Sequence, residues 1–347
     1  MRETRLATAL SAEPLPSEGT VLVLGAAGDA DLAGMPADRL RVVQGFRPDH
    51  DALAARGLRV MPEPEGQDHA AAVVFLPRSR AEGRDRVAQA MARCRPGAPV
   101  WIDGQKTDGI DTMLRDLRAR LPVPDPLAQA HGKCVRIAAD PAALADWQAD
   151  DLIPAPGFVT RPGVFSAEAV DAGSALLAGA LPVEMKGRVV DLGAGWGWLA
   201  AQVLARPGVT QLDLIEADHT ALACARSNID DPRAAFHWAD ATRLTAGEPY
   251  QAVVCNPPFH TGRATDPTLG QAFIAAAARI LSGSGTLWLV ANRQLPYEAA
   301  LAASFREVEP LAVSGGFKLF RAAQPQSRRP RPAAPAAPQR ATSRGRR

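Results

Sequence analysis

The sequence predicts an α/β protein made of two doubly wound domains in tandem, each built on a mainly parallel sheet. Three observations lead to this fold class. Short apolar runs alternate with helical patterns along the chain, a glycine turn follows the first apolar run of each half, and the order of segments in the first half returns in the second. With 347 residues, 47% of them hydrophobic, the chain is long enough to bury two cores.

The clearer copy of the pattern lies in the second half. Residues 187–199, GRVVDLGAGWGWL, predict a buried strand, a turn with three glycines and a helix. Further on, LDLIEADHTAL predicts a second strand with the start of a helix, and AVVCNPPF predicts a strand that two prolines end. The copy closes with a helix in AFIAAAARIL, a strand in TLWLVA and a last segment in GFKLFRA.

The first half repeats this order with weaker motifs. Its segments are, in order, VLVLGAAGDADL, LRVVQGFRPDHDAL, AVVFLPRSR, DRVAQAMARC, PVWIDG and GKCVRIA, and Trp101 falls opposite Trp288. We interpret this coincidence as a duplication. It predicts a first domain at residues 1–140, a linker at 141–157 and a second domain at 158–323.

The polar residues differ between the two copies. Val23 stands opposite Asp191, and Gln44 stands opposite Glu216. The first copy therefore keeps the pattern of the fold and loses the polar chemistry, which predicts a ligand site in the second domain only. The remaining replacements in the first copy are Ala27 for Gly195, Asp29 for Gly197, Leu76 for Asn256, Arg78 for Pro258 and Ser79 for Phe259.

The positive charge of the chain is concentrated at its C-terminus. Residues 324–347 contain seven arginines and no acidic residue, which leaves 32 basic against 37 acidic residues, a net charge of −5, in the rest of the chain. Five prolines and few apolar side chains predict that this basic tail is disordered. Such a tail either attracts phosphates or serves only as a solubilising end.

The composition argues against a membrane protein and against a metal site. No apolar run approaches the roughly 20 residues of a membrane span, and the N-terminal residues lack the apolar core of a signal peptide. The four cysteines are far apart, which is typical of reduced core thiols, and the six histidines are scattered. We expect a cytoplasmic monomer without a metal and without membrane contact.

The segment QAVVCNPPFH, residues 251–260, carries the side chains best suited to chemistry. Residues 252–255 predict a buried strand, so Asn256 lies at a carboxyl end, where parallel sheets hold ligands. The Asn256 side-chain oxygen and the Pro257 carbonyl can accept the two hydrogens of an exocyclic NH2, while Phe259 stacks on a ring. The predicted catalytic residues are Asn256, Pro257, Pro258 and Phe259.

A second group of residues predicts a cofactor that contains a nucleoside. The glycines of DLGAGWG permit close approach of a ligand, and Glu216, 19 residues after Gly197, can accept from both ribose hydroxyls. Asp191 would repel the pyrophosphate of a nicotinamide dinucleotide but attract an ammonium group, which favours S-adenosyl-L-methionine. Asp240 either accepts from the adenine amino group or is a plain turn residue. The predicted cofactor-binding residues are Asp191, Gly193, Ala194, Gly195, Gly197, Glu216, Asp240 and Ala241.

Residues 158–322 resemble the class I S-adenosylmethionine-dependent methyltransferases. The segments FVTRPGVFSAEAVDAGSALL, DLGAGWG, NPPFH, LVANRQLPYEAAL and GFKLFRA are similar to those of the guanine-N2 enzymes in the ribosomal RNA small-subunit methyltransferase C family. This resemblance implies Rossmann-like methyltransferase domains in tandem, with an inactive N-terminal copy. It implies methylation of a guanine N2 in 16S ribosomal RNA, with ribosomal RNA or a small-subunit ribosomal particle as partner. His260 would then relay a proton or contact RNA, and residues 162–166 would cover the cofactor.

Three alternatives stay open at this point. Protein-glutamine N5 and DNA adenine-N6 methyltransferases use a similar Asn-Pro-Pro-aromatic turn. The duplicated N-terminal half disfavours both, since the glutamine enzymes usually carry a small helical domain there. A non-enzymatic RNA-binding ribosome-assembly module could also be built on an inactive methyltransferase scaffold. The polar groups kept in the second copy disfavour that alternative.

Overall fold

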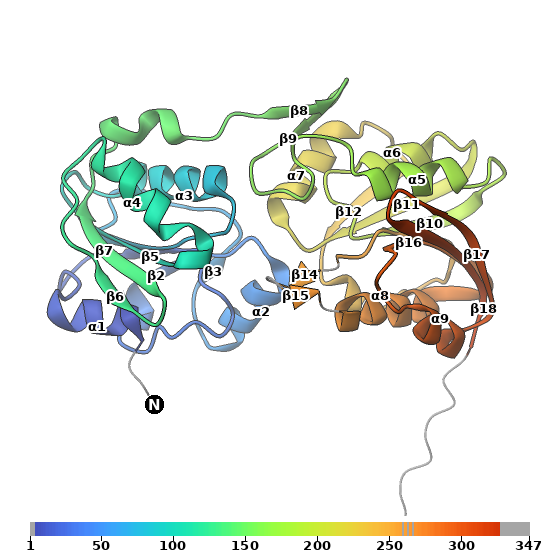
Figure 1. Ribbon diagram of the computed structural model, residues 1–347, viewed down its shortest axis with the longest axis horizontal. Helices are drawn as coiled ribbons and strands as arrows, with labels where there is room; N and C mark the ends of the chain where they lie inside the picture. Colours follow the sequence, from blue (N-terminus) through green and yellow to red (C-terminus); the bar gives the residue numbers. More distant parts are fainter. Residues whose placement is uncertain (1–3, 259, 262–263, 266, 327–347) are drawn as a thin grey trace, which may run out of the picture.

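The computed structural model describes residues 4–258, 260–261, 264–265 and 267–326. Within them the chain forms two seven-stranded sheets side by side (Figure 1). Their strand orders are β3-β2-β1-β4-β5-β7-β6 and β12-β11-β10-β13-β16-β18-β17, so the two sheets have one topology. The predicted fold class, tandem doubly wound α/β domains, is confirmed. The predicted basic tail lies outside the described residues from position 327 onward.

The first sheet is covered by helices on both faces. Its inner strand β1 is buried throughout, as expected for a parallel strand with an unbroken apolar run. Helices α1 and α2 pack on one face, and α3 and α4 pack on the other. The elements are α1 Arg5–Ala12, β1 Val21–Leu24, η1 Ala37–Arg39, β2 Leu40–Val43, α2 Arg47–Ala55, β3 Val60–Met61, β4 Ala71–Phe75, α3 Arg80–Arg93, β5 Pro99–Gln105, η2 Lys106–Asp108, α4 Ile110–Arg118, β6 Leu127–Gln129 and β7 Gly132–Ala138.

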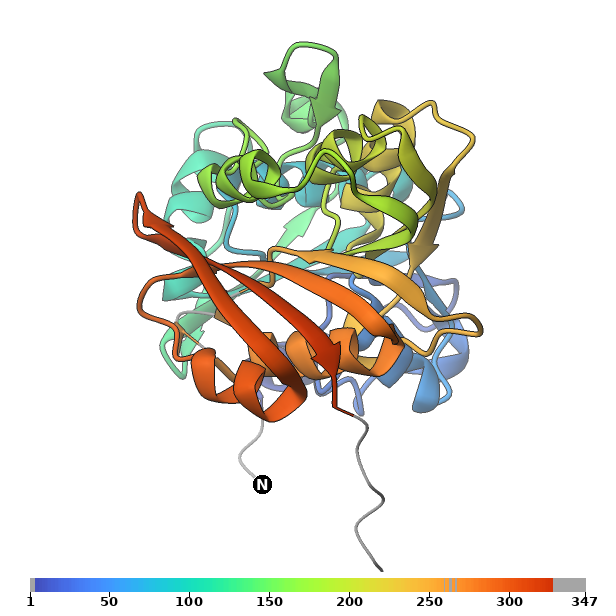
Figure 2. The same ribbon diagram turned by 90° about the vertical axis from the view of Figure 1, so that its right-hand side faces the viewer.

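The second sheet has the same layered build (Figure 2). Val189 and Val254 pack toward α5, α6 and α7, whereas their neighbours Val190 and Val253 pack toward α8 and α9 on the other face. The elements are α5 Ala172–Ala180, β10 Lys186–Leu192, α6 Trp198–Leu204, β11 Gly208–Glu216, α7 His219–Asn228, β12 Ala234–Trp238, η4 Ala241–Arg243, β13 Tyr250–Cys255, β14 His260–Thr261, β15 Ala264–Thr265, α8 Pro267–Ile280, β16 Leu281–Asn292, α9 Glu298–Ser304, β17 Phe305–Ser314 and β18 Phe317–Pro325.

The segments at the predicted domain limits have structure of their own. The expected linker, residues 141–157, contains η3 (Ala142–Trp147) and β8 (Leu152–Ala155), and β8 pairs with β9 (Phe158–Thr160). Strand β18 runs to Pro325, two residues beyond the limit of 323 that the sequence suggested. The limits of the two domains therefore stay a prediction. No helix in the described part of the chain is long and apolar enough to cross a membrane.

The strand pairing shows how the two copies correspond. Val23 pairs with Val73 in the first sheet, and Asp191 pairs with Val254 in the second. The two partners, Val73 and Val254, pair in turn with the matching tryptophans of β5 and β16. The register therefore confirms that the first copy has a valine where the second has Asp191.

The same register corrects one expected correspondence. Two positions beyond Val73 and Val254, the register places Phe75 opposite Asn256, and not Leu76 as the sequence alignment suggested. The alignment slipped by one because it matched the Ala-Val-Val runs of the two strands, residues 72–74 and 252–254, which the register offsets by one residue. The corrected partners that follow are Pro77 for Pro258 and Arg78 for Phe259.

The two domains meet through a short backbone contact. The Gly45 carbonyl accepts from the His219 amide (2.9 Å), and the Arg47 amide donates to the Ala217 carbonyl (2.8 Å). The indole nitrogen of Trp238 donates to the same two carbonyls, at 3.0 and 2.8 Å. The first domain is thereby tied to the segment that joins β11 to α7.

Candidate functional site

The polar residues predicted from the sequence converge at one edge of the second sheet. Strands β11, β10 and β13 are parallel neighbours, so their carboxyl ends lie together. A hollow opens at this edge. Asp191 and Asn256 line it from the sheet, the turn at residues 193–195 and the start of α6 form one wall, and the segment from Phe165 to Ser174 forms the other.

The turn between β10 and α6 depends on its glycines. Gly193, Gly195 and Gly197 have φ of +78°, +55° and +88°, a region that other residues rarely adopt. A Cβ on Gly197 would lie 2.9 Å from the Ile229 side chain and 3.1 Å from that of Ala225, so a larger residue would push α6 away from α7. The turn thus brings backbone close to the hollow without side chains in the way.

Asp191 is a buried carboxylate with an unusual environment. It is 1% exposed, and neither carboxylate oxygen has a hydrogen-bond partner among the described residues. Burial raises the pKa of Asp191 to about 8, and the nearby charge of Glu216 adds to the effect. A buried carboxylate without a donor is costly, so the site is complete only when a donor or a cation enters the hollow.

Glu216 ends β11 with both oxygens oriented by backbone amides. One oxygen accepts from the Gly195 amide and the other from the Asp218 amide, each at 2.8 Å. Removal from solvent raises the pKa of Glu216 to about 7, although these hydrogen bonds act in the opposite direction. Each oxygen keeps a lone pair, so the side chain can accept two further hydrogen bonds from a diol.

Asn256 follows β13 with its amide group fixed in orientation. Its nitrogen donates to the Asp171 carboxylate at 2.7 Å and to the Ser174 hydroxyl at 2.9 Å. With the nitrogen committed in this way, the amide oxygen is the atom available to accept from a ligand. Pro257 is buried and Pro258 is exposed, whereas Phe259, predicted to stack on a base, lies outside the described residues.

The sequence left two roles open for Asp240, a contact with adenine or a place in a turn, and the structure shows it in a turn. It caps η4, and one carboxylate oxygen accepts from the amide and the hydroxyl of Thr242, at 2.9 and 2.6 Å. Ala241 is buried, and neither residue lines the hollow. A contact between this pair and adenine stays a prediction. The second carboxylate oxygen of Asp240 would have to make that contact.

The segment before α5 reaches over the hollow. The indole nitrogen of Trp196 donates to the Phe165 carbonyl at 3.2 Å, and its ring meets Phe158 edge to face at 5.5 Å. Phe165 and Ser166, which the sequence predicted as part of a cover, line the hollow. Trp196 is 4% exposed, so most of its ring is packed against this segment.

The next feature is the placement of the side chains that could bind a metal ion. The four cysteines are buried free thiols. Among the described residues there is no group of three or more histidine, cysteine, aspartate or glutamate side chains that could hold an ion.

Known proteins resemble this chain over most of its length. Residues 156–321 match the family described as Methyltransferase small domain. The ribosomal RNA small subunit methyltransferase C of Pseudomonas paraeruginosa is 34% identical over 270 residues, which cover 74% of this chain and 79% of that protein. The protein of the same name from Ectopseudomonas mendocina is 33% identical over 321 residues, which cover 85% and 95%. The chain belongs to the ribosomal RNA small subunit methyltransferase C family.

A solved structure extends the likeness to both domains. The T. thermophilus 16S rRNA N2 G1207 methyltransferase, in complex with AdoMet and guanosine, superposes with a TM-score of 0.76 at 26% identity and covers 93% of each chain. The methyltransferase C fold therefore includes the N-terminal copy as well as residues 156–321. The family that the sequence motifs suggested is confirmed.

In this member of the methyltransferase C family, the sequence predicted the residues at the strand ends and missed those at the start of α5. The structure brings Asp191 and Asn256 to one hollow and places Glu216 beside the glycine turn. Sequence reasoning did not assign a role to Asp171 or Ser174, although both lie in a segment that resembles the family. The one available signal was Asp171, a residue type that often caps helices, three residues before Ser174. That signal predicts the start of a helix and does not predict a partner for Asn256.

Proposed function

We infer that the chain is an S-adenosyl-L-methionine-dependent methyltransferase that methylates the exocyclic N2 of a guanine in 16S ribosomal RNA. One observation carries this assignment: the unpaired carboxylate of Asp191 and the oriented amide of Asn256 line the same hollow. A cation-seeking group and an acceptor for an NH2 group thus lie side by side. The named function of the relatives and the AdoMet and guanosine bound to the solved structure support this cofactor and this substrate.

The cofactor is held by groups at the ends of three strands. Asp191 fits its ammonium group, because an ammonium supplies the donors that both carboxylate oxygens lack. Glu216 accepts from the ribose hydroxyls, and the glycine turn leaves room for the ligand. We assign the adenine amino group to Asp240 and the adjoining Ala241 backbone. When bound, S-adenosylmethionine supplies an electrophilic methyl group.

The substrate amine is held by the turn after β13. The Asn256 oxygen and the Pro257 carbonyl accept the two hydrogens of the guanine N2, which fixes the direction of the nitrogen lone pair. The guanine leaves its stack to reach the hollow, at a cost of a few kcal/mol that stacking on Phe259 partly offsets. These residues contribute orientation. The nitrogen becomes acidic as it bonds to the methyl group and can lose one proton to solvent, so the turn would need no strong base.

The substrate sets the rest of the proposal. Ribosomal RNA, free or in a small-subunit particle, is the partner, and a cytoplasmic location goes with that partner and with the reduced cysteines. The arginines of residues 324–347 would add attraction to RNA phosphates that is independent of sequence. A monomer is sufficient for this chemistry, since both halves of the proposed site come from one chain.

The test is methylation by the purified protein. It is incubated with S-adenosylmethionine that carries a deuterated methyl group, and with either small ribosomal subunits or protein-free 16S RNA. Mass spectrometry of the digested nucleosides should find deuterated N2-methylguanosine. A parallel reaction contains DNA in place of RNA. Label in the N6-methyldeoxyadenosine of that DNA, or in a glutamine peptide of a subunit protein, would instead support one of the alternative substrates, and no label anywhere would support a binding module.

A further inference from the structure

Asn256 does not stand alone at the end of its strand. Its amide nitrogen donates to the Asp171 carboxylate at 2.7 Å and to the Ser174 hydroxyl at 2.9 Å, so both of its hydrogens are used. The partners lie 85 and 82 residues earlier in the chain. They come from the start of α5, which packs on the face of the sheet to which Asn256 points.

The two partners are themselves held in place. Asp171 caps α5, and the same carboxylate oxygen accepts from the Ser174 amide at 2.7 Å. One oxygen therefore binds the helix and Asn256 together. The closed set of three contacts fixes the position of Asn256 relative to a rigid element, which the two prolines after it would not do by themselves.

These contacts also decide which end of the Asn256 amide faces a substrate. A flipped amide would set its oxygen against the carboxylate oxygen of Asp171, two acceptors at hydrogen-bond distance, so the flipped orientation is excluded. A negative partner at the nitrogen draws positive charge toward that end of the amide, which leaves the oxygen a stronger acceptor.

We propose that Asp171 and Ser174 are positioning residues for the methyl-transfer step, which hold Asn256 so that its oxygen accepts from the substrate amine. The proposal rests on the function inferred above. According to this proposal, the start of α5 contributes to methyl transfer in addition to capping the helix. That contribution is separate from the binding of the cofactor by Asp191.

Two substitutions separate positioning from helix capping. Asp171→Ser keeps a residue that caps helices well but is too short to reach Asn256 as well. Ser174→Ala removes only the hydroxyl, and alanine favours the helix. We expect kcat to fall about 100-fold in the first variant, as for a misplaced catalytic group, and about tenfold in the second, as for one lost hydrogen bond. The dissociation constant for S-adenosylmethionine should stay unchanged in both.

Thr4→Ala is the matched control. Thr4 caps α1 in the first domain through a hydrogen bond to the Ala7 amide and is remote from the hollow. Thr4→Ala should lower thermal stability at least as much as Asp171→Ser does, while kcat stays unchanged. A fall of kcat in Thr4→Ala equal to that in Asp171→Ser would show that general destabilisation, and not positioning, is responsible.

A rescue experiment tests the pairing itself. Asn256→Asp places two carboxylates at hydrogen-bond distance and should reduce turnover strongly. Adding Asp171→Asn removes this repulsion, because the new amide can keep its oxygen on the Ser174 amide while its nitrogen turns to donate to the carboxylate at position 256. The double variant should therefore be at least about tenfold faster than Asn256→Asp alone. A helix cap that acts only on folding predicts no rescue, because asparagine and aspartate cap equally well.

The outcomes distinguish this proposal from the proposed function. If the wild-type protein labels no guanine N2 in ribosomal RNA, the function itself is wrong. If the wild-type protein is active while Asp171→Ser and Ser174→Ala keep full kcat, or the double variant shows no rescue, the positioning role is wrong and the function stands.

Discussion

Asp191 and Glu216 form a pair of neighbouring carboxylates at the carboxyl ends of β10 and β11, and the pKa of each is raised above its ordinary value. The pKa is about 8 for Asp191 and about 7 for Glu216, mainly because both are removed from solvent. Glu216 has backbone donors and Asp191 has none among the described residues. The ligand-free protein therefore holds a proton at this site near neutral pH, and a cationic ligand would displace it.

This pair predicts that the ligand-free protein loses stability as pH rises. The pKa of Asp191 in the folded state lies above its ordinary value of 3.8, so its favourable contribution is complete below that value and is lost as pH rises toward 8. Asp191→Asn cannot ionise, and it should melt about 5 °C higher than the wild type at pH 8.5, with a smaller difference at pH 6. Melting curves of both proteins from pH 6 to pH 9 test this, and a difference that does not change with pH would contradict it.

The same substitution should have the opposite effect on the cofactor. Loss of a charged partner for an ammonium group should weaken S-adenosylmethionine about 10- to 100-fold at pH 8.5. At pH 7 the wild type should release close to one proton as the ligand binds. Calorimetry in two buffers of different ionisation enthalpy measures that release. Equal affinities of the two proteins at pH 8.5 would remove the assigned role of Asp191.

Arg86 predicts that each chain binds one cofactor and not two. In the first domain its guanidinium donates to the Phe75 carbonyl at 2.8 Å and to Glu82 at 2.6 Å, and it lies against the glycine turn at Gly25. It thus fills the space directly against the glycine turn, which in the second domain belongs to the hollow. A cavity of about 400 Å³ remains beside it, between the domains. Titration calorimetry should give one S-adenosylmethionine per chain, and a second site of similar affinity would contradict the prediction that this copy is inactive.

Trp238 predicts a link between the domain contact and the cofactor site. Its ring lies under the Arg47 guanidinium at 4.8 Å and meets His50 and His219 edge to face at 4.9 and 5.3 Å. Trp238→Ala should cost about 3 kcal/mol in unfolding free energy and weaken S-adenosylmethionine, because the indole also holds the Ala217 carbonyl next to Glu216. Denaturant unfolding and calorimetry measure the two effects. Trp238→Phe keeps the ring, so it should retain more stability, and an unchanged affinity in both variants would refute the link.

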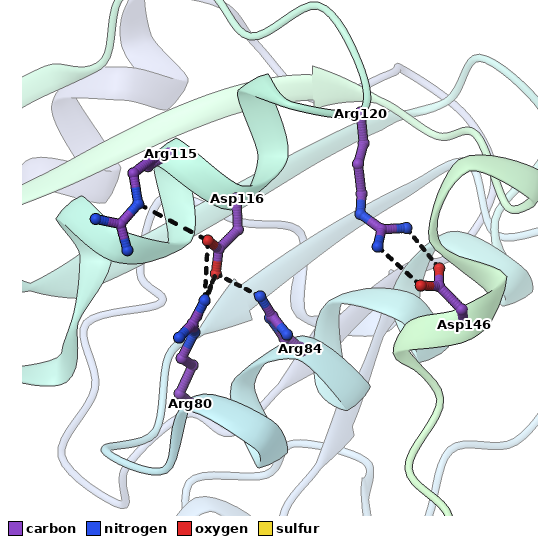
Figure 3. Close-up of polar contacts among 6 residues, drawn as sticks. All are labelled: Arg80, Arg84, Arg115, Asp116, Arg120 and Asp146. Carbon is purple, nitrogen blue, oxygen red and sulfur yellow. Dashed lines mark hydrogen bonds and ion pairs between the residues drawn. The ribbon is translucent and has the colours of Figure 1, made fainter.

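Asp116 and Asp146 predict how much burial matters for the ion pairs of the first domain. Asp116 is 10% exposed and joins α4 to Arg80 and Arg84 of α3, with Arg115 of its own helix at 4.0 Å, whereas Asp146 is 62% exposed and pairs with Arg120 (Figure 3). Asp116→Ala removes the carboxylate partner of Arg84, which is 34% exposed, and should cost about 1 to 2 kcal/mol. Asp146→Ala should have little effect, since exposed pairs contribute little. Equal losses in denaturant unfolding would show that burial does not decide.

Much of the fold could be predicted because its signals are local. Apolar runs gave the buried strands, prolines ended β13, and the glycine turn preceded α6. The meeting of Asp191, Glu216 and Asn256 also followed from the sequence, because parallel neighbours end at one edge of a sheet. The correspondence of the two copies held for Val23 and failed by one residue at β4 and β13, where a shared Ala-Val-Val run suggested a different register from the observed one.

What the sequence did not predict depends on contacts between distant segments. The partners of Asn256 come from the start of a helix more than 80 residues away, and a helix cap has the same sequence pattern whether or not it serves a site. Arg86 could equally have been an exposed residue of α3. The cluster around Trp238 joins residues of two domains, and no periodicity within one segment points to it.

The measurement that tests the central claim most directly is single-turnover methylation by Asn256→Ala. The reaction uses small ribosomal subunits or 16S RNA, saturating labelled S-adenosylmethionine, and detection of N2-methylguanosine. We predict that the rate falls at least about 100-fold while the dissociation constant for S-adenosylmethionine stays close to that of the wild type. A variant that methylates guanine at the wild-type rate would contradict the claim that the Asn256 oxygen holds the substrate amine.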